Sequence, residues 1–370
     1  MSVYEYIVVA VLVGGVMLPQ NGRKRKNYII LMAGIHTFVC GFRYCYLTGD
    51  LQKYGWNFYD MVNRAWLSES MLAGGRNTLF FMFSKLISEL TGDFQVFLFL
   101  IALIVEIGVA AIIYRYSPMP WMSYLVWNCI GFYIFGFSAI KQALAMGILL
   151  FSLMCILEDN LKGFLIFTLI AGFIHMPAFI FLPAYWIAKS HINNTMILMY
   201  VFSGVLIYAN RTYIVSFFSE AYYDDMKFIE NTTSRIGGRF LVIVLMLVTG
   251  FIIKGYREEV FEKLFNLVVM AAFIQMFSSF DNVFTRLTDY YLQCSILYIP
   301  LLFKKGTNIG KYDYRRRPAM VHFSEPSKRL FIGLMALILI WYYYRTNLMA
   351  QITSEVDNYL NFRFMWDVVQ

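Results

Sequence analysis

Long apolar runs recur from one end of this chain to the other, and they constrain its fold more than any other feature. Each run holds roughly 15 to 21 residues, close to the about 20 that a helix needs to cross the hydrocarbon core of a bilayer. Of the 370 residues, 59% are hydrophobic and 15% are charged, whereas soluble domains carry about 25% charged residues. We therefore predict an all-α polytopic membrane protein.

Twelve hydrophobic passages make up the predicted helical bundle. They cover residues 3–20, 28–47, 94–114, 121–137, 143–157, 163–174, 176–188, 195–210, 239–253, 264–280, 288–303 and 330–344. The sequence "HMP" that begins at His175 predicts a pair of short helices meeting there, with one long kinked helix as the alternative. Residues 77–91 are expected to form an interfacial or re-entrant helix rather than a span.

Basic residues gather in alternate loops, which indicates the orientation in the membrane. With the N-terminus outside, the inner loops hold 18 Lys and Arg and 7 Asp and Glu. Loops rich in Lys and Arg stay on the cytoplasmic side. We therefore expect both termini and the long loops 48–93 and 211–238 to lie outside, and the linker 304–329 to lie inside. The net charge of +8 follows this topology and gives no reason to expect nucleic-acid binding.

The chain is expected to form one integral membrane domain over residues 1–370. The first apolar run is followed by the basic run "RKRK", the reverse of a cleavable signal peptide, so we expect an uncleaved first span. The five cysteines lack metal-ligand spacing and are interpreted as small packing residues. No glycine-rich phosphate loop, HExxH or CxxC motif is present. We expect no cofactor, with a divalent metal left open.

Polar side chains at the predicted outer ends of the passages are the candidate functional residues, because charge inside a bilayer is costly and usually marks function. They are Arg43, Asp50, Lys141, Gln142, His175, Arg235, Arg239, Asp281, Arg286 and Asp289. Several cations with a carboxylate and a histidine at one depth predict an outward-facing cavity that handles an anion, because guanidinium groups bind phosphate well. Each has a structural alternative: the cations can snorkel to headgroups, His175 can cap a broken helix, and Asp50 can be a turn or N-cap residue.

Arg43 and Asp50 lie seven residues apart near the end of the second passage. We expect Gly49 to end the helix between them, so that Arg43 points into the cavity from the span and Asp50 turns back over it from the loop. A direct ion pair would satisfy both residues, so we expect them to be separated. Outer-loop aromatics such as Tyr54 could stack on sugar rings. Glu106 lies within the third passage, far from this outer set, and helix–helix hydrogen bonding is its expected role.

Four stretches carry a resemblance to a known family across nearly the whole chain. They are "FRYCYLTGDLQKY", "SAIKQALAMGILL", "AGFIHMPAFI" and "FTRLTDYYLQCSILYIP". Their order and spacing resemble the EpsG family of bacterial exopolysaccharide proteins, which is close to the Wzy-type polysaccharide polymerases. Two departures stand out: Lys141 occupies a position where the family usually has arginine, and no residue separates Gly49 from Asp50. Lysine keeps the charge but lacks the planar fork.

The resemblance implies a membrane glycosyltransferase of the GT-C type in the bacterial cytoplasmic membrane. It would join polyprenyl-diphosphate-linked oligosaccharides at the outer face, with cations stabilising the departing diphosphate and a base activating the attacking hydroxyl. The candidate diphosphate ligands are Arg43, Lys141, Arg239 and Arg286. The candidate base is Asp50, with His175 as the alternative. The secondary substrate-binding candidates are Gln142, Arg235, Asp281 and Tyr290.

Two other functions are open from the sequence. A lipid-linked oligosaccharide flippase or exporter also needs many spans, although such transporters often show paired halves that are not visible here. A membrane acyltransferase is compatible with an outward-facing His175, but no HxxxD-type motif supports it. Besides the bilayer and the lipid-linked oligosaccharides, a chain-length regulator and a flippase of the same pathway are candidate partners.

Overall fold

The described part of the chain is helical. The computed structural model describes residues 3–18, 22–45, 49–66, 77–222, 237–254, 259–304, 324–345 and 362–367. Within these residues there is no strand, and the only β-type pairing is an isolated antiparallel bridge between Arg43 and Phe364. Most of the predicted inner linker 304–329 lies outside the described residues, as does Arg235.

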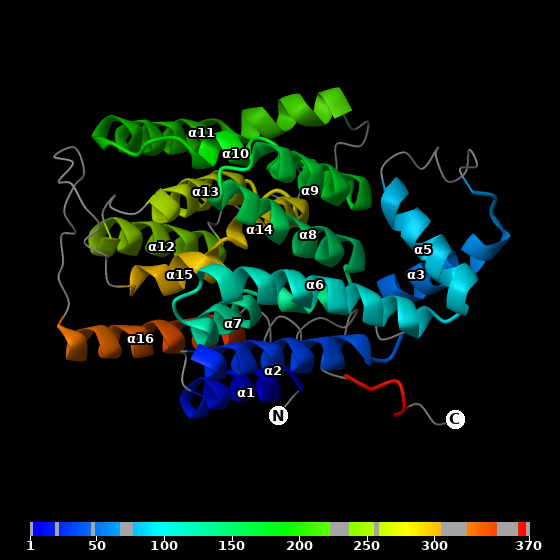
Figure 1. The fold of residues 1–370 in the computed structure, drawn as a ribbon. Coiled ribbons are helices and arrows are strands. Elements are labelled where there is room, and N and C mark those ends of the chain that lie inside the picture. Colours follow the sequence, from blue (N-terminus) through cyan, green and yellow to red (C-terminus); the bar gives the residue numbers. More distant parts are fainter. Residues whose placement is uncertain are drawn as a thin grey trace. The chain divides into compact units, whose positions relative to one another are not determined.

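The chain divides into two compact units, of which the first comprises Met1–Phe179 with Glu325–Gln370. Its helices run largely alongside one another (Figure 1). They are α1 (Val3–Met17), α2 (Gly22–Gly41), α3 (Gly49–Asp60), η1 (Met61–Asn63), α5 (Thr78–Thr91), α6 (Phe94–Tyr116), α7 (Pro120–Cys129), η2 (Tyr133–Phe137), α8 (Ile140–Leu157), α9 (Leu161–Ile174) and α16 (Glu325–Tyr343).

Helix α6 packs between α2 and α8, and α8 in turn packs against α9. Small residues allow α6 and α8 to approach closely. A Cβ added to Gly108 would collide with the carbonyl oxygen of Gly147, and one added to Gly147 would lie 2.8 Å from Cα of Val105. Because lipid tails are as apolar as the helix surfaces, close packing of this kind is a main source of helix association in membranes.

One end of the first unit collects three of the loops that were predicted to lie inside. Arg25, at the start of α2, donates to the carbonyl oxygens of Tyr114 at 2.8 Å and Ser117 at 2.9 Å. Arg115 forms an ion pair of 3.0 Å with Glu158, which follows α8. The start of α2 and the ends of α6 and α8 therefore meet, as an alternating course through the bilayer requires.

The second unit, Ile180–Ser324, is built around one central helix. Helix α13 (Glu259–Gln275) contacts the five others, which are α10 (Ala184–Ala188), α11 (Asn194–Tyr222), α12 (Gly238–Lys254), α14 (Asn282–Leu292) and α15 (Ser295–Leu302). The predicted passage 288–303 is broken in this unit, because Gln293 and Cys294 separate α14 from α15.

A helix lies in each of the twelve predicted passages, but most of these helices are short. Among the described residues, three are long and apolar enough to cross a bilayer by length and composition: Phe94–Tyr116, Ile140–Leu157 and Thr195–Ser216. The predicted break at His175 is confirmed, because α9 ends there and the 3₁₀ helix η3 (Met176–Phe181) follows. The number of crossings, the orientation, the interfacial position of α5 and the single membrane domain stay predictions.

Candidate functional site

Lys141 lies in a cage of aromatic rings within the first unit. Its Nζ atom is 5.2 Å from the ring centroid of Tyr54, 5.1 Å from that of Phe80 and 4.7 Å from that of Phe81. Within the described residues Lys141 has no hydrogen bond or ion pair, so its charge is stabilised by the ring faces alone. Cation–π contacts are worth about 0.5–1 kcal/mol each at exposed sites and more when desolvated. The cage holds the ammonium group without neutralising it.

The backbone at Lys141 also favours an anion. Lys141 and Gln142 stand in the first turn of α8, where amide groups lack intrahelical acceptors and the helix dipole is positive. The N-cap residue, Ala139, has no side chain that could accept these hydrogen bonds. Gln142 is buried, and its Nε2 atom lies 3.9 Å from Sδ of Met146.

Two further predicted residues, Asp50 and His175, lie on elements that are connected to this cage. Asp50 is exposed in the first turn of α3, one helical turn before Tyr54, so the two side chains share a face of that helix. His175 is the C-cap of α9, and the amide of the next residue donates to Oδ1 of Asn77 at 3.3 Å. Asn77 is the N-cap position of α5, which carries two rings of the cage. Lys141 and the residue after His175 therefore both contact the first residues of α5 or its N-cap, and Asp50 shares a helix face with Tyr54 of the cage.

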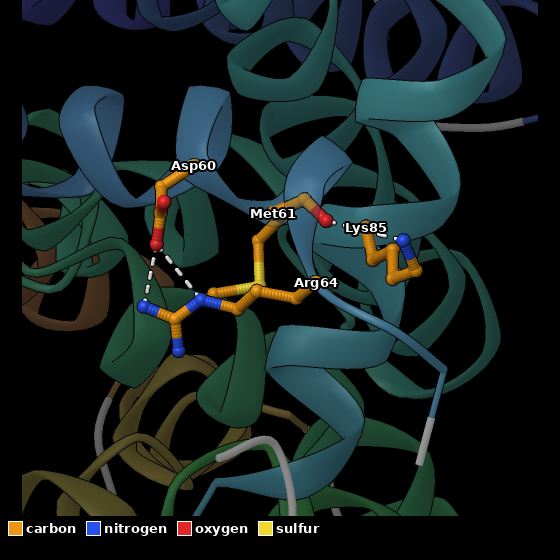
Figure 2. A network of polar contacts seen from close by, with 4 residues as sticks. All are labelled: Asp60, Met61, Arg64 and Lys85. Carbon is orange, nitrogen blue, oxygen red and sulfur yellow. Dashed lines mark hydrogen bonds and ion pairs between the residues drawn. The ribbon is translucent and has the colours of Figure 1, made fainter. Parts of the chain in front are cut away.

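A buried lysine fixes α3 to α5. Lys85, which is 2% exposed, donates to the carbonyl oxygen of Met61 at 3.1 Å (Figure 2). It also forms an ion pair of 2.6 Å with Glu89 of the same helix. Figure 2 also shows Arg64 paired with Asp60, at 2.8 Å from Nε and 2.6 Å from Nη2. The contact between Lys85 and Met61 holds η1, the continuation of α3, against α5, and it thereby helps to set the position of Tyr54.

Arg43 differs from the sequence expectation, because it is not on the second helix. Helix α2 ends at Gly41, and Gly49 begins α3 instead of ending a helix; that prediction was wrong. The Arg43 side chain is 1% exposed, donates to the carbonyl oxygen and Sγ of Cys40, and lies over the Phe137 ring. Its Nε and Nη2 atoms have no hydrogen-bond partner among the described residues. As expected, the ion pairs of the described residues include none between Arg43 and Asp50.

The C-terminal segment 362–367 covers this region. The Tyr44 amide donates to the carbonyl oxygen of Arg363 at 2.8 Å, and the Met365 amide donates to that of Phe42 at 2.9 Å. The ring of Phe362 also contacts Tyr4, at the start of α1. The start of α1, the end of α2 and the C-terminal segment therefore share one end of the unit. The side of the membrane on which the termini lie stays a prediction.

Glu106 is buried, and its Oε1 atom accepts a hydrogen bond of 3.1 Å from Nε1 of Trp127. This contact between α6 and α7 confirms the expected helix–helix role. Glu106 also lines a small cavity together with Cys40, the residue that Arg43 contacts. The expectation that Glu106 lies apart from the outer candidate residues stays a prediction.

The second unit contains the remaining candidates. Arg239, near the start of α12, pairs with Asp289 of α14; their side chains are 15% and 0% exposed. Arg286 is exposed, one turn before Asp289 on the same helix. Asp281 is the N-cap of α14, where its Oδ1 atom accepts from the Val283 amide at 2.6 Å, which gives it a structural role. Tyr290 is buried.

Sequence reasoning missed the cage and the pairing of Arg239. Tyr54 was interpreted as a membrane-interface aromatic or a residue that stacks on sugar rings, and Phe80 and Phe81 lie in the segment 77–91, which was expected to form an interfacial or re-entrant helix. The available signal was the pair of adjacent aromatics near the start of that segment. No group of three or more His, Cys, Asp and Glu side chains suited to a metal occurs in the described part of the chain.

Comparison with known proteins gives one match. The family model described as "EpsG family" matches residues 26–314, about four-fifths of the chain. The match includes Arg43, Asp50, Lys141, His175 and Arg286, and it excludes the C-terminal segment 362–367. No curated protein and no solved structure matches the sequence.

Proposed function

Because the chain belongs to the EpsG family, we propose that it polymerises polyprenyl-diphosphate-linked oligosaccharides into an exopolysaccharide at the outer face of the bacterial cytoplasmic membrane. The family and the apolar helices support a membrane protein connected with exopolysaccharide. One observation carries the catalytic part of the proposal. The ammonium group of Lys141 is held by aromatic rings and is not paired with a carboxylate of the described residues, and Tyr54 of the cage shares a helix face with the exposed carboxylate of Asp50.

The reaction is a glycosyl transfer. A hydroxyl oxygen of one oligosaccharide attacks the anomeric carbon of another, the bond from that carbon to the diphosphate oxygen breaks, and the hydroxyl proton passes to a base. Negative charge grows on the departing diphosphate, so a cation fixed beforehand lowers the barrier. Lys141 suits this role because the three rings hold its ammonium group while no carboxylate among the described residues competes for it.

Asp50 is the proposed base. It is exposed and shares a helix face with Tyr54, one of the rings around Lys141. A base must reach the attacking hydroxyl, and an exposed carboxylate without an ion-pair partner in the described residues meets that requirement. His175 is the alternative, because it caps α9 beside the N-cap of α5.

Arg286 is the proposed diphosphate ligand from the second unit, because its side chain is exposed. Arg239 is paired with Asp289, so its charge is already partly compensated. We propose that Arg239 acts chiefly by holding α12 against α14. Gln142 and Tyr290 are buried and are proposed as supporting residues.

The test uses the purified full chain in detergent, supplied with a polyprenyl-diphosphate-linked oligosaccharide. A polymerase produces a ladder of products without a bilayer, whereas a flippase cannot, and an acyltransferase requires an acyl donor. We expect the wild-type chain to give the ladder and Arg286→Ala to abolish it while expression and membrane insertion are unchanged. Absence of the ladder from the folded wild-type chain would refute polymerisation. Wild-type product length from Arg286→Ala would refute its role.

A further inference from the structure

An apolar groove runs along the second unit between α11 and α12. Both helices contact α13, which forms its floor. The groove encloses about 660 Å³, and no charged side chain lines it. Along α12 its lining extends from Phe240 to Ile252, which corresponds to about 18 Å at about 1.5 Å per residue. Val201, Val205 and Val248 line it and are each partly exposed, so the groove is accessible from the surface of the unit.

A polar pocket adjoins one end of this groove. The two share Tyr208 of α11, Phe240 of α12 and Met276, the residue that directly follows α13. The pocket adds Arg211, Ser278 and Ser279. At the other end the groove is lined by Ile197, Ile252 and Tyr200, whose hydroxyl donates to Oδ1 of Asn266, so the described lining carries a charged group only at the Arg211 end.

Two groups in the polar pocket lack the partners that would satisfy them. The guanidinium group of Arg211 lies 4.0 Å from the Tyr208 ring and donates to that residue's carbonyl oxygen at 3.2 Å, but no carboxylate in the described residues neutralises it. Gln275 also lines the pocket, is 3% exposed, and its Oε1 atom has no hydrogen-bond partner. Buried polar groups without partners are rare in folded proteins. The pocket therefore favours a ligand head that is anionic and also carries hydrogen-bonding groups.

We propose that the groove and the polar pocket together bind the lipid carrier, with its isoprenoid chain along α11 and α12 and its diphosphate at Arg211. The ligand class follows from the amphipathic shape of the site: a long apolar channel ending at an uncompensated cation. Arg239 directly precedes Phe240, so the headgroup end is also the end of α12 that carries a sequence-predicted candidate. The choice of a polyprenyl diphosphate over another anionic lipid rests on the proposed function.

Tryptophan substitutions test the groove. Val248 lines it, whereas Leu245 lies on the same helix, does not line it, and has almost the same exposure, 44% against 47%. Val248→Trp and Leu245→Trp therefore place the same large side chain at two positions of comparable exposure on one helix. Binding is measured by native mass spectrometry of the full chain in detergent, titrated with undecaprenyl diphosphate, inorganic diphosphate or phosphatidylglycerol.

We expect Val248→Trp to weaken undecaprenyl diphosphate binding about tenfold, the order of effect of excluding a few methylene groups from an apolar site. Leu245→Trp should bind like wild type, and Arg211→Gln should weaken the diphosphate lipid more than phosphatidylglycerol. Equal binding by the Val248 and Leu245 variants would overturn the proposal, and so would phosphatidylglycerol binding as tightly as the diphosphate lipid.

This assay contains no acceptor sugar, so it separates the two proposals. Lipid binding that is sensitive to Val248→Trp, in a chain that makes no product ladder, supports the groove and refutes polymerisation. A ladder that is unchanged in Val248→Trp refutes the groove and leaves polymerisation standing.

Discussion

Replacing Lys141 by methionine tests the proposed mechanism most directly, because it removes the charge and keeps a side chain of similar length in the cage. Loss of one fixed donor or cation to the departing diphosphate should lower the rate of polymer formation about 10²-fold or more, the range measured for single groups that stabilise developing negative charge. Lys141→Arg restores a cation of the type usual in the family and should retain most of the activity.

The effect on stability should be small, which distinguishes a catalytic from a structural role. Three cation–π contacts of about 0.5–1 kcal/mol each are lost, or at most about 3 kcal/mol. Against this, methionine requires no desolvation of a charge, and its sulfur can contact the rings for about 0.3–1.5 kcal/mol each. The two contributions nearly cancel.

The assay is the product ladder from detergent-purified protein, with thermal unfolding followed in parallel. Lys53→Met is the matched control, because Lys53 is exposed on α3 next to Tyr54 and is not part of the cage. We expect it to behave like wild type. A Lys141→Met variant that forms polymer at the wild-type rate would refute the catalytic assignment, and one that unfolds at much lower temperature would make the lysine structural.

Two further substitutions address the other candidates. Asp289→Asn should destabilise the chain by about 3 kcal/mol, because it leaves the largely buried Arg239 without its counter-charge. Unfolding in detergent measures this loss. The double variant Asp289→Leu with Arg239→Met should recover most of the lost stability. Unchanged stability in the single variant would show that the pair contributes little. Asp50→Asn should slow polymer formation about 10²-fold at matched protein levels, as expected for a lost base. Near-normal polymer would transfer the base role to His175.

The helical class and the main helix positions were predictable because apolar runs are a local property of sequence. The break at His175 followed from the proline two residues later, which cannot continue the hydrogen bonding of α9. The course around Gly49 was not predictable in the same way. Glycine is strongly enriched just after helix ends, which favoured the wrong assignment, although it also occurs at helix starts. The bridge that follows the end of α2 joins Arg43 to Phe364, which lie far apart in the sequence.

The candidate residues were predictable as a set but not in their individual roles. A charge in an apolar passage is visible in the sequence, whereas its partner is not, because the partner comes from another helix. Arg239 and Asp289 lie 50 residues apart, and the rings around Lys141 come from α3 and α5. Family resemblance located these positions without indicating which charges are compensated.

The four cations that the sequence proposed as equivalent diphosphate ligands therefore differ in how far their charge is already neutralised by the protein. Arg239 is paired with a buried carboxylate, and Arg43 is buried, lies over the Phe137 ring and donates to Cys40, its one hydrogen-bond partner in the described part of the chain. Arg286 is exposed, and Lys141 is held by rings that leave its charge available. A cation that stabilises a leaving group must be fixed, accessible and uncompensated, because a charge already neutralised has little left to offer the developing diphosphate anion. Lys141 meets all three conditions. Its side chain is flexible and lacks the planar fork of the arginine usual at this position in the family, but the three rings around it fix the position of its ammonium group.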